Sequence, residues 1–231
     1  MNNNILYARA LASRIMNDDP ENSNDDNEKK LTVETSANHV YFYANVDTDR
    51  CLAMIREVRD LDNTLRNERL TRNIPDGEGH VPIWLHIQSN GGDLFAGLAA
   101  ADQLEKFTTP IYSIVEGVCA SAATLISLAC DKKYITKRSY MLIHQFWSAM
   151  WGKYEEFKDE MVLQDMLIET LTEFYIDRTK MDETQVRAYL KRDSWFNSEK
   201  CIELGLTDEV IWLYKIVKKE LLNTKVYDKV L

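Results

Sequence analysis

Short apolar segments alternate with turn residues from His39 onward, and their spacing predicts alternating strands and helices. The segment "HVYFYANV" (39–46) predicts a strand, and "TDRCLAMIREVRDLDNTL" (48–65) predicts a helix opened by an Asp or Thr cap. A loop over residues 66–82 carries the Pro, Gly and Asp typical of an exposed connection. It leads into a buried strand, "IWLHI" (83–87).

After this strand, the segment "QSNGGDLFAGLAAADQLEKF" (88–107) fits two structures. Asn-Gly usually signals a two-residue hairpin, but the apolar residues that follow have helical spacing: Leu94, Leu98, Ala101 and Leu104. We therefore predict a glycine turn and then a helix. The order repeats with a strand at 110–116, a glycine turn, a helix at 119–130 and strands at 133–136 and 140–145. This succession predicts an α/β fold, in which ligands bind at the carboxyl ends of strands.

The C-terminal part is more helical. Apolar residues spaced three, four and seven apart predict one long amphipathic helix from Tyr154 to about Lys180, and core packing is enough to explain them. A short helix begun by Asp182 and another capped by Ser198 and ended by Gly205 follow. The segment "DEVIWLY" (208–214) then predicts a last strand.

The N-terminal segment differs in composition from the rest. Residues 17–30 are polar and acidic without large apolar groups, so burial cannot offset the entropy lost on ordering them. We expect a disordered linker there, which leaves residues 1–16 as a short amphipathic arm. Residues 31–231 then form a single domain.

Composition and charge narrow the function classes. With 45% hydrophobic residues the chain can build a core, whereas a net charge of −9 and the lack of a basic stripe argue against a nucleic-acid surface. No apolar stretch approaches the roughly 20 residues that cross a bilayer. The first residues also lack the layout of a signal peptide. We therefore expect a cytoplasmic protein that binds neither nucleic acid nor membrane.

The cysteines and histidines give little support for a metal site. The four cysteines form no C-x-x-C pair and have no histidine at ligand spacing, which favours reduced, structural thiols. His80 and His86 flank the start of a predicted strand and lack a nearby third ligand. We expect no metal.

One hydroxyl group lies among very small side chains in "GVCASAATLISLAC" (117–130), at Ser121. A serine in such a segment can be present only because it is small, as we expect for Ser127. Ser121, however, lies at a predicted helix start, where free amides can stabilise an oxyanion. The preceding Gly117 and the alanines also give a substrate backbone close access. His144 ends a strand of the same predicted sheet and can serve as the base that a serine nucleophile requires.

The order of several motifs resembles the proteolytic subunit of the Clp protease, ClpP. The resemblance covers roughly residues 39–213 and is carried by "IQSNGGDLFAGLAAADQL", "GVCASAATLISLA", "MLIHQ" and "KRDSWFNSEKCIELGLTDEVI". It implies that Ser121 is the nucleophile, His144 the base and Asp193 the carboxylate that orients the base. It also implies an oxyanion hole at Gly92, Asp93 and Ala122, and a role for Arg192 in ring packing.

The resemblance further implies a crotonase-like α/β domain with a protruding handle helix. Such subunits assemble into two stacked rings of seven and enclose their active sites, so that only unfolded polypeptide enters. Cleavage needs no cofactor, and ATP is used only by a partner AAA+ unfoldase of the Clp type. This chain itself has no G-x-x-x-x-G-K-[ST] phosphate loop.

The sequence departs from the family pattern beside the predicted site. Asn90 replaces a proline in the glycine turn, Ala122 and Ala123 replace Met-Gly, and "FWSAMWGK" replaces a proline and glycine after His144-Gln145. The resemblance implies that this last segment lines the substrate groove and leads into the handle helix. We therefore expect Phe146, Trp147 and Trp151 to alter peptide preference, ring pairing, or both.

Two other functions stay open. One is a ring subunit that has lost turnover and assembles with an active paralogue, which the altered segment after His144 permits. The other is an acyl-CoA enzyme on the same fold, which would hold an oxyanion without a serine nucleophile. The Arg192-Asp193 segment and the spacing between Ser121 and His144 disfavour the second.

Overall fold

The computed structural model describes residues 33–73, 81–145 and 152–211. The predicted arm (1–16), the predicted linker (17–30), His80 and the aromatic residues of "FWSAMW" lie outside the described residues. Among the described helices, none has the length and apolar character needed to span a membrane.

The described residues form a mixed sheet of eight strands. Five of them run parallel in the order β2-β3-β4-β5-β8, with β1 antiparallel at the edge. Near its carboxyl end β4 also pairs with β6 in parallel, and β7 is antiparallel to β6. The strands are β1 (Val33–Ser36), β2 (His39–Phe42), β3 (Ile83–Ser89), β4 (Ile111–Ala120), β5 (Lys132–Thr136), β6 (Tyr140–Ile143), β7 (Ser194–Asn197) and β8 (Glu209–Ile211).

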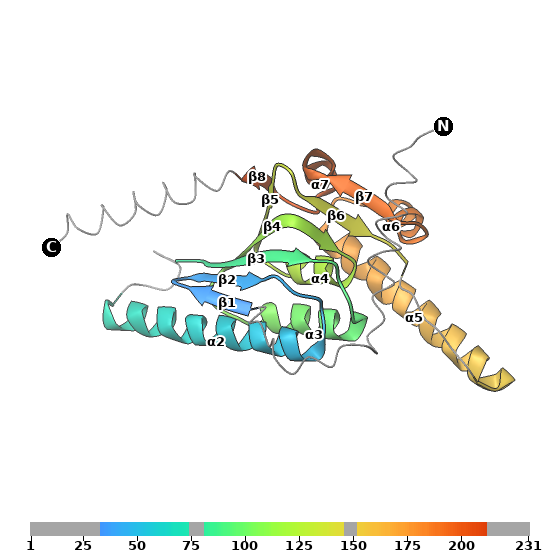
Figure 1. Cartoon of the computed structure of the whole chain (residues 1–231), viewed down its shortest axis with the longest axis horizontal. Helices are drawn as coiled ribbons and strands as arrows, with labels where there is room; N and C mark the ends of the chain where they lie inside the picture. Colours follow the sequence, from blue (N-terminus) through green and yellow to red (C-terminus); the bar gives the residue numbers. More distant parts are fainter. Residues whose placement is uncertain (1–32, 74–80, 146–151, 212–231) are drawn as a thin grey trace, which may run out of the picture. The chain divides into compact units, whose positions relative to one another are not determined.

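Helices cover one face of this sheet. In Figure 1, α2 and α3 lie along the same side of β1 to β4, and α5 extends away from the strands. The helices are α2 (Thr48–Thr71), α3 (Leu94–Leu104), α4 (Ala122–Leu128), α5 (Tyr154–Arg178), α6 (Glu183–Leu190) and α7 (Ser198–Leu204). Together these elements confirm the predicted α/β class.

The period-two pattern of the strands sorts their side chains between two environments. Phe42, Leu85 and Ile87 are fully buried in the core, together with Met54 of α2 and Ala101 of α3. Rings point from alternate positions of β2 to β5 and contact one another on the sheet: His39, Tyr41, Trp84, His86, Tyr112 and Tyr134.

Several predicted helix boundaries are confirmed by capping interactions. The carboxylate of Asp47 accepts from the Arg50 amide at the start of α2, and that of Asp182 accepts from Gln185 at the start of α6. Gly205 ends α7 with φ 76°, and a Cβ there would lie 2.7 Å from the Lys180 amide nitrogen. The predicted Ser198 cap is wrong, because Asn197 accepts from the Lys200 amide and Ser198 is already helical.

Other predictions differ from the structure in extent. The predicted glycine turn at Gly117 is wrong, since β4 continues through it to Ala120, and α4 is correspondingly shorter than 119–130. Helix α2 runs to Thr71, so the first third of the predicted loop is helical. The short edge strands β1 and β7 had no counterpart among the predicted elements.

All four cysteines are free and buried. Burial is the main cause that raises the pKa of each thiol, to about 11 for Cys51 and about 12 for Cys130 and Cys201. The thiols therefore stay protonated at neutral pH, in agreement with a structural role.

Candidate functional site

Ser121 occupies a sharp turn between a strand and a helix. Strand β4 ends at Ala120 and α4 begins at Ala122, while Ser121 between them has φ 56° and ψ −130°. A positive φ is uncommon for a residue other than glycine and persists only where surrounding contacts hold it. In α/β-hydrolases, a strained strand-to-helix turn of this kind exposes a nucleophilic serine at the end of a sheet.

Hydrogen bonds on both sides hold the backbone of this turn. The Ser121 amide donates to the Leu142 carbonyl at 2.9 Å. The Ser121 carbonyl accepts from the Thr124 amide at 2.9 Å and from Thr124 Oγ1 at 2.7 Å. These contacts anchor the turn to β6 on one side and to α4 on the other.

Strand register brings the three predicted triad residues to one corner of the sheet. Ala120 of β4 pairs with Leu142 of β6, and Ile143 of β6 pairs with Ser194 of β7. Ser121 follows Ala120, His144 follows Ile143, and Asp193 precedes Ser194. Residues from three separate parts of the chain therefore meet at the carboxyl ends of β4 and β6.

The His144 ring lies beside the Asp193 carboxylate. Nδ1 of His144 and Oδ1 of Asp193 are 3.9 Å apart, beyond the 2.7–3.2 Å of an N–H···O hydrogen bond but within range of a charge interaction. The His144 side chain is 13% exposed and that of Asp193 is 52% exposed. Desolvation lowers the pKa of His144 and outweighs the Asp193 charge and a backbone hydrogen bond at Gln145, both of which raise it. A neutral imidazole at neutral pH can accept a proton.

The glycine turn after β3 packs directly against the serine turn. A Cβ placed on Gly91 would lie 2.6 Å from the Ala120 carbonyl oxygen, 2.6 Å from Ser121 Cβ and 3.3 Å from the Ala122 amide nitrogen. The sequence prediction named Gly92 from this turn and missed Gly91. The only signal for Gly91 was the doubled glycine in "SNGG". The sequence does not say which of the two glycines contacts the serine.

The predicted oxyanion donors are not equivalent in this arrangement. The Asp93 amide donates to the Val46 carbonyl at 2.8 Å, and the Asp93 carboxylate caps α3 by accepting from the Ala96 amide. Its amide is therefore already engaged in the turn, which disfavours Asp93 as a donor to substrate. Gly92 and Ala122 remain the better candidates.

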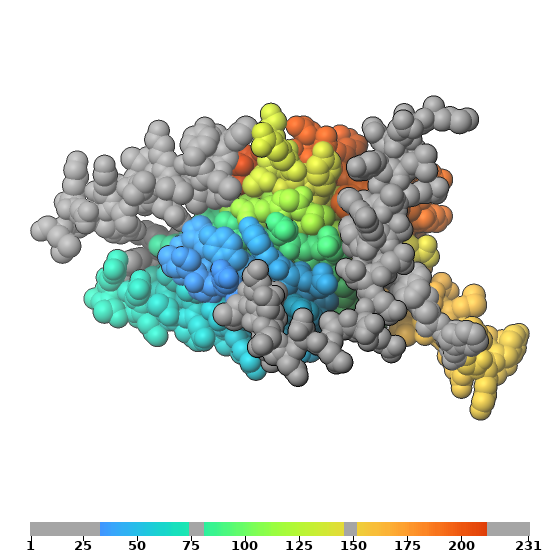
Figure 2. All heavy atoms as spheres, in the orientation of Figure 1, coloured from blue at the N-terminus to red at the C-terminus, as the bar shows by residue number. Residues whose placement is uncertain are grey.

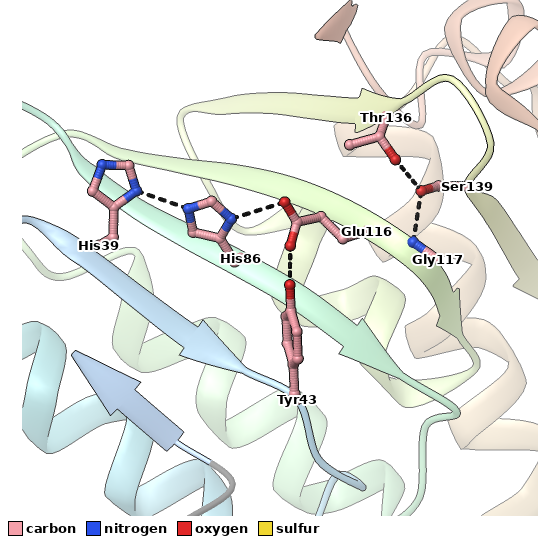
Figure 3. Close-up of polar contacts among 7 residues, drawn as sticks. All are labelled: His39, Tyr43, His86, Glu116, Gly117, Thr136 and Ser139. Atoms are coloured by element: carbon pink, nitrogen blue, oxygen red, sulfur yellow. Dashed lines mark hydrogen bonds and ion pairs between the residues drawn. The ribbon is translucent and has the colours of Figure 1, made fainter. Parts of the chain in front are cut away.

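A second polar cluster lies on the sheet away from this corner. In Figure 3, the His39 ring faces the His86 ring, which in turn faces the Glu116 carboxylate. His39 Nδ1 lies 2.8 Å from His86 Nε2, and His86 Nδ1 lies 3.1 Å from Glu116 Oε1. The Tyr43 hydroxyl donates to the same carboxylate. Desolvation of Glu116 is outweighed by the hydrogen bonds from His86 and Tyr43, so its pKa is lowered.

Hydrogen bonds within this cluster explain how His86 is accommodated in the fold. His86 is 3% exposed and contacts His39 and Glu116, whereas His80 lies outside the described residues. No group of three or more His, Cys, Asp or Glu side chains suited to a metal ion occurs in the described ranges.

Comparisons with known proteins point to one family. A family profile described as Clp protease matches residues 36–213. The chain is 32% identical over 131 residues to the ATP-dependent Clp protease proteolytic subunit 2 of Treponema denticola, covering 56% of this chain and 66% of that protein. It is 26% identical over 175 residues to the ATP-dependent Clp protease proteolytic subunit of Streptococcus mutans, covering 73% of this chain and 88% of that protein.

A third relative gives the same picture. The chain is 30% identical over 134 residues to the ATP-dependent Clp protease proteolytic subunit 1 of Protochlamydia amoebophila, covering 56% of this chain and 65% of that protein. The chain thus spans about two thirds of the Treponema and Protochlamydia proteins. The residues matched by the family profile include Ser121, His144 and Asp193.

Proposed function

The chain belongs to the Clp protease family, and on that basis we propose that it is a serine peptidase subunit that cleaves unfolded polypeptide. The observation that carries this proposal is the shared corner: strand register brings Ser121, His144 and Asp193 together, and Ser121 lies in a strained turn. A serine hydroxyl is a weak nucleophile at neutral pH and needs an adjacent base. His144, with its lowered pKa, is suited to that role.

The proposed reaction follows the logic of a catalytic triad. His144 takes the proton of the Ser121 hydroxyl as the oxygen attacks the peptide carbonyl, and later returns it to the leaving amine. Asp193 orients the imidazole through Nδ1 and stabilises its charged form. This requires the 3.9 Å separation to shorten by about 1 Å to a hydrogen bond, as catalytic contacts often do when substrate binds.

The developing oxyanion would be held by backbone amides of Gly92 and Ala122. The close contact of the glycine turn with Ser121 supports this placement. One such donor is worth roughly 2.7–4 kcal/mol of transition-state stabilisation in serine proteases. Water completes the hydrolysis, so the chemistry needs neither metal nor organic cofactor.

We further propose that nucleotide hydrolysis belongs to a partner. The curated relatives are named ATP-dependent, whereas this sequence lacks a phosphate-binding loop of the G-x-x-x-x-G-K-[ST] type. An AAA+ unfoldase of the Clp type would therefore supply unfolded polypeptide to a chamber formed by copies of this subunit.

Helix α5 supports the proposed self-assembly. Its N-terminal half projects beyond the other coloured atoms in Figure 2. It carries exposed apolar side chains, an arrangement that marks an interaction surface on a water-soluble domain. They are Tyr154 (72% exposed), Phe157 (45%), Met161 (66%), Val162 (60%), Leu163 (41%) and Met166 (62%). We propose that this surface packs against other subunits in stacked rings, seven to a ring as in the family.

Charges on this surface are expected to dissociate the assembly. The double variant Met161→Glu/Met166→Glu places two carboxylates where apolar contact is proposed, and desolvating them without partners is costly. We expect light scattering to show a shift from ring-sized particles to smaller species. Helix content by circular dichroism should stay unchanged, because both positions are exposed. Glu173→Gln, elsewhere on α5, is the control, and an unchanged particle mass in the double variant would contradict the role of this surface.

The pH dependence should reflect the lowered pKa of His144. An ordinary His is protonated below pH 6.5, but here the ring stays neutral to a lower pH. We expect the acid limb of Ser121 reactivity to lie below pH 6.5. Asp193→Asn removes a charge that raises this pKa, so it should move the limb lower still and reduce the plateau rate. Rates of probe labelling from about pH 5 to pH 8 measure both effects. An acid limb of wild-type labelling above pH 6.5 would contradict the lowered pKa of His144.

The same shift has a consequence for stability. The unfolded chain takes up a proton on His144 as the pH falls through 6.5, before the folded chain does. This contribution therefore lowers the free energy of unfolding in the acid direction, until the folded pKa is also passed.

One alternative keeps support from the geometry. The 3.9 Å separation of His144 from the half-exposed Asp193 is also what a ring subunit without turnover would show. In that case the chain would assemble with an active paralogue and contribute structure rather than cleavage.

Covalent labelling distinguishes the two functions. Purified protein is separated by size, each fraction is measured by light scattering, and a fluorophosphonate probe is added. Probe attached to the peptide that contains Ser121, in ring-sized fractions, supports the peptidase. Ring-sized protein that never labels, alone or with an added Clp-type unfoldase, supports the structural subunit.

A further inference from the structure

A buried hydroxyl group of α5 reaches the turn that holds Ser121. Tyr175 is 3% exposed, and its Oη lies 2.6 Å from Oγ1 of Thr124, which is fully buried. Thr124 is in the first turn of α4, three residues after Ser121. Two side-chain hydroxyls, those of Tyr175 and Thr124, therefore connect α5 to the backbone of the candidate nucleophile.

The direction of these hydrogen bonds follows from counting protons. Thr124 Oγ1 donates its single proton to the Ser121 carbonyl at 2.7 Å. In the 2.6 Å contact it must then accept, so the Tyr175 hydroxyl is the donor. Desolvation is the largest cause that raises the pKa of Tyr175, so the phenol keeps its proton at any pH at which the fold is expected to be stable.

The hydrogen bonds from Tyr175 through Thr124 end at the Ser121 carbonyl, which belongs to the same peptide unit as the amide of Ala122, the proposed oxyanion donor. The Ser121 carbonyl and the Ala122 amide share one planar, trans peptide group, so the C=O and N–H bonds point in opposite directions. Holding the oxygen toward Thr124 fixes the amide toward the opposite side. Ser121 has φ 56° and ψ −130°, an uncommon combination, so the orientation of the following peptide depends on such contacts to persist.

We propose that Thr124 and Tyr175 are positioning residues that aim the Ala122 amide at the substrate oxyanion. This inference rests on the proposed function, since it assigns the two hydroxyls to the oxyanion hole of that reaction. Neither residue is expected to touch substrate. Their effect passes through the orientation of the peptide between Ser121 and Ala122.

Three variants separate positioning from packing. Thr124→Val keeps the shape of the side chain and removes the hydroxyl, whereas Thr124→Ser keeps the hydroxyl and loses a methyl group. Tyr175→Phe removes only the outer donor. We expect Thr124→Val to lower kcat by about tenfold or more, short of the 10²–10³-fold that loss of an oxyanion donor costs, with KM little changed.

The conservative variant and the pH profile make the test specific. Thr124→Ser should restore most of kcat although it leaves a small cavity, and Tyr175→Phe should show a smaller loss than Thr124→Val. The acid limb assigned to His144 should not move in any of them, since neither hydroxyl contacts that ring. Equal losses in Thr124→Val and Thr124→Ser, or a raised KM with unchanged kcat, would overturn the inference.

A second readout does not depend on turnover. Amide hydrogen exchange of the peptide covering residues 120–124, followed by mass spectrometry on the assembled wild-type protein and each variant, reports how firmly the turn is held. Thr124→Val should speed exchange there and Thr124→Ser should not. If wild-type protein neither labels nor cleaves, the proposed function fails. Whatever that result, unchanged exchange in Thr124→Val would overturn the positioning role.

Discussion

Replacing Ser121 by alanine is expected to lower peptide hydrolysis on the order of 10⁴–10⁶-fold and to abolish labelling by a fluorophosphonate. The variant lacks the oxygen that attacks the carbonyl, so what remains is the catalysis that amides and binding provide. The fold should persist for two reasons. Alanine and serine both carry a Cβ, so the cost of φ 56° is similar for both, and the backbone hydrogen bonds to Leu142 and Thr124 do not involve the side chain of residue 121. Hydrolysis of an unfolded reporter polypeptide measures the effect.

Ser127, about one and a half helical turns after Ser121, provides a matched control. Ser127 is fully buried in α4, and its hydroxyl lies 3.1 Å from that of Ser113. Ser127→Ala removes a buried hydrogen bond worth about 1 kcal/mol of stability but should leave labelling intact. If Ser121→Ala kept both labelling and hydrolysis, the nucleophile would have to be sought elsewhere.

The elements that the sequence predicted well are those with a strong local signal. Helix α3 has regular apolar spacing, and α5 follows its predicted span almost to the end. Gly117 misled the prediction because a glycine between two apolar segments is typical of a turn. Its φ of 71° is indeed one that glycine readily adopts, but the strand continues through it. In the structure its amide donates to Ser139 Oγ at 2.7 Å, a contact between distant segments that keeps β4 extended.

For the candidate site, the sequence could name residues but not predict their arrangement. A serine after small residues and a histidine at a strand end are local features, whereas Asp193 came from the family resemblance. The register that places Asp193 beside His144 depends on β7, a four-residue strand whose pairing with β6 could not be predicted from its own sequence. Likewise, the engagement of the Asp93 amide with Val46 is a long-range contact without a local signal.

Gly91→Ala is expected to disrupt the site while the related variant Gly117→Ala spares it. Both glycines have positive φ, 93° and 71°, so alanine carries a similar backbone cost of about 1–2 kcal/mol at each. The two differ in what the added methyl group meets. At Gly117 it meets Oε1 of Gln88 at 3.3 Å, the end of a flexible side chain that can move.

At Gly91 the methyl group would lie 2.6 Å from both the Ala120 carbonyl oxygen and Ser121 Cβ, and the carbonyl belongs to the backbone of β4. Relief therefore requires the glycine turn and the serine turn to separate, which withdraws an oxyanion donor from the nucleophile. We expect kcat/KM to fall by about 10²–10³-fold, as for loss of one such donor. Gly117→Ala should lower the melting temperature by less than Gly91→Ala, through the backbone cost alone, and should keep most activity. Equal activity in the two variants would show that contact between these turns is not required for cleavage.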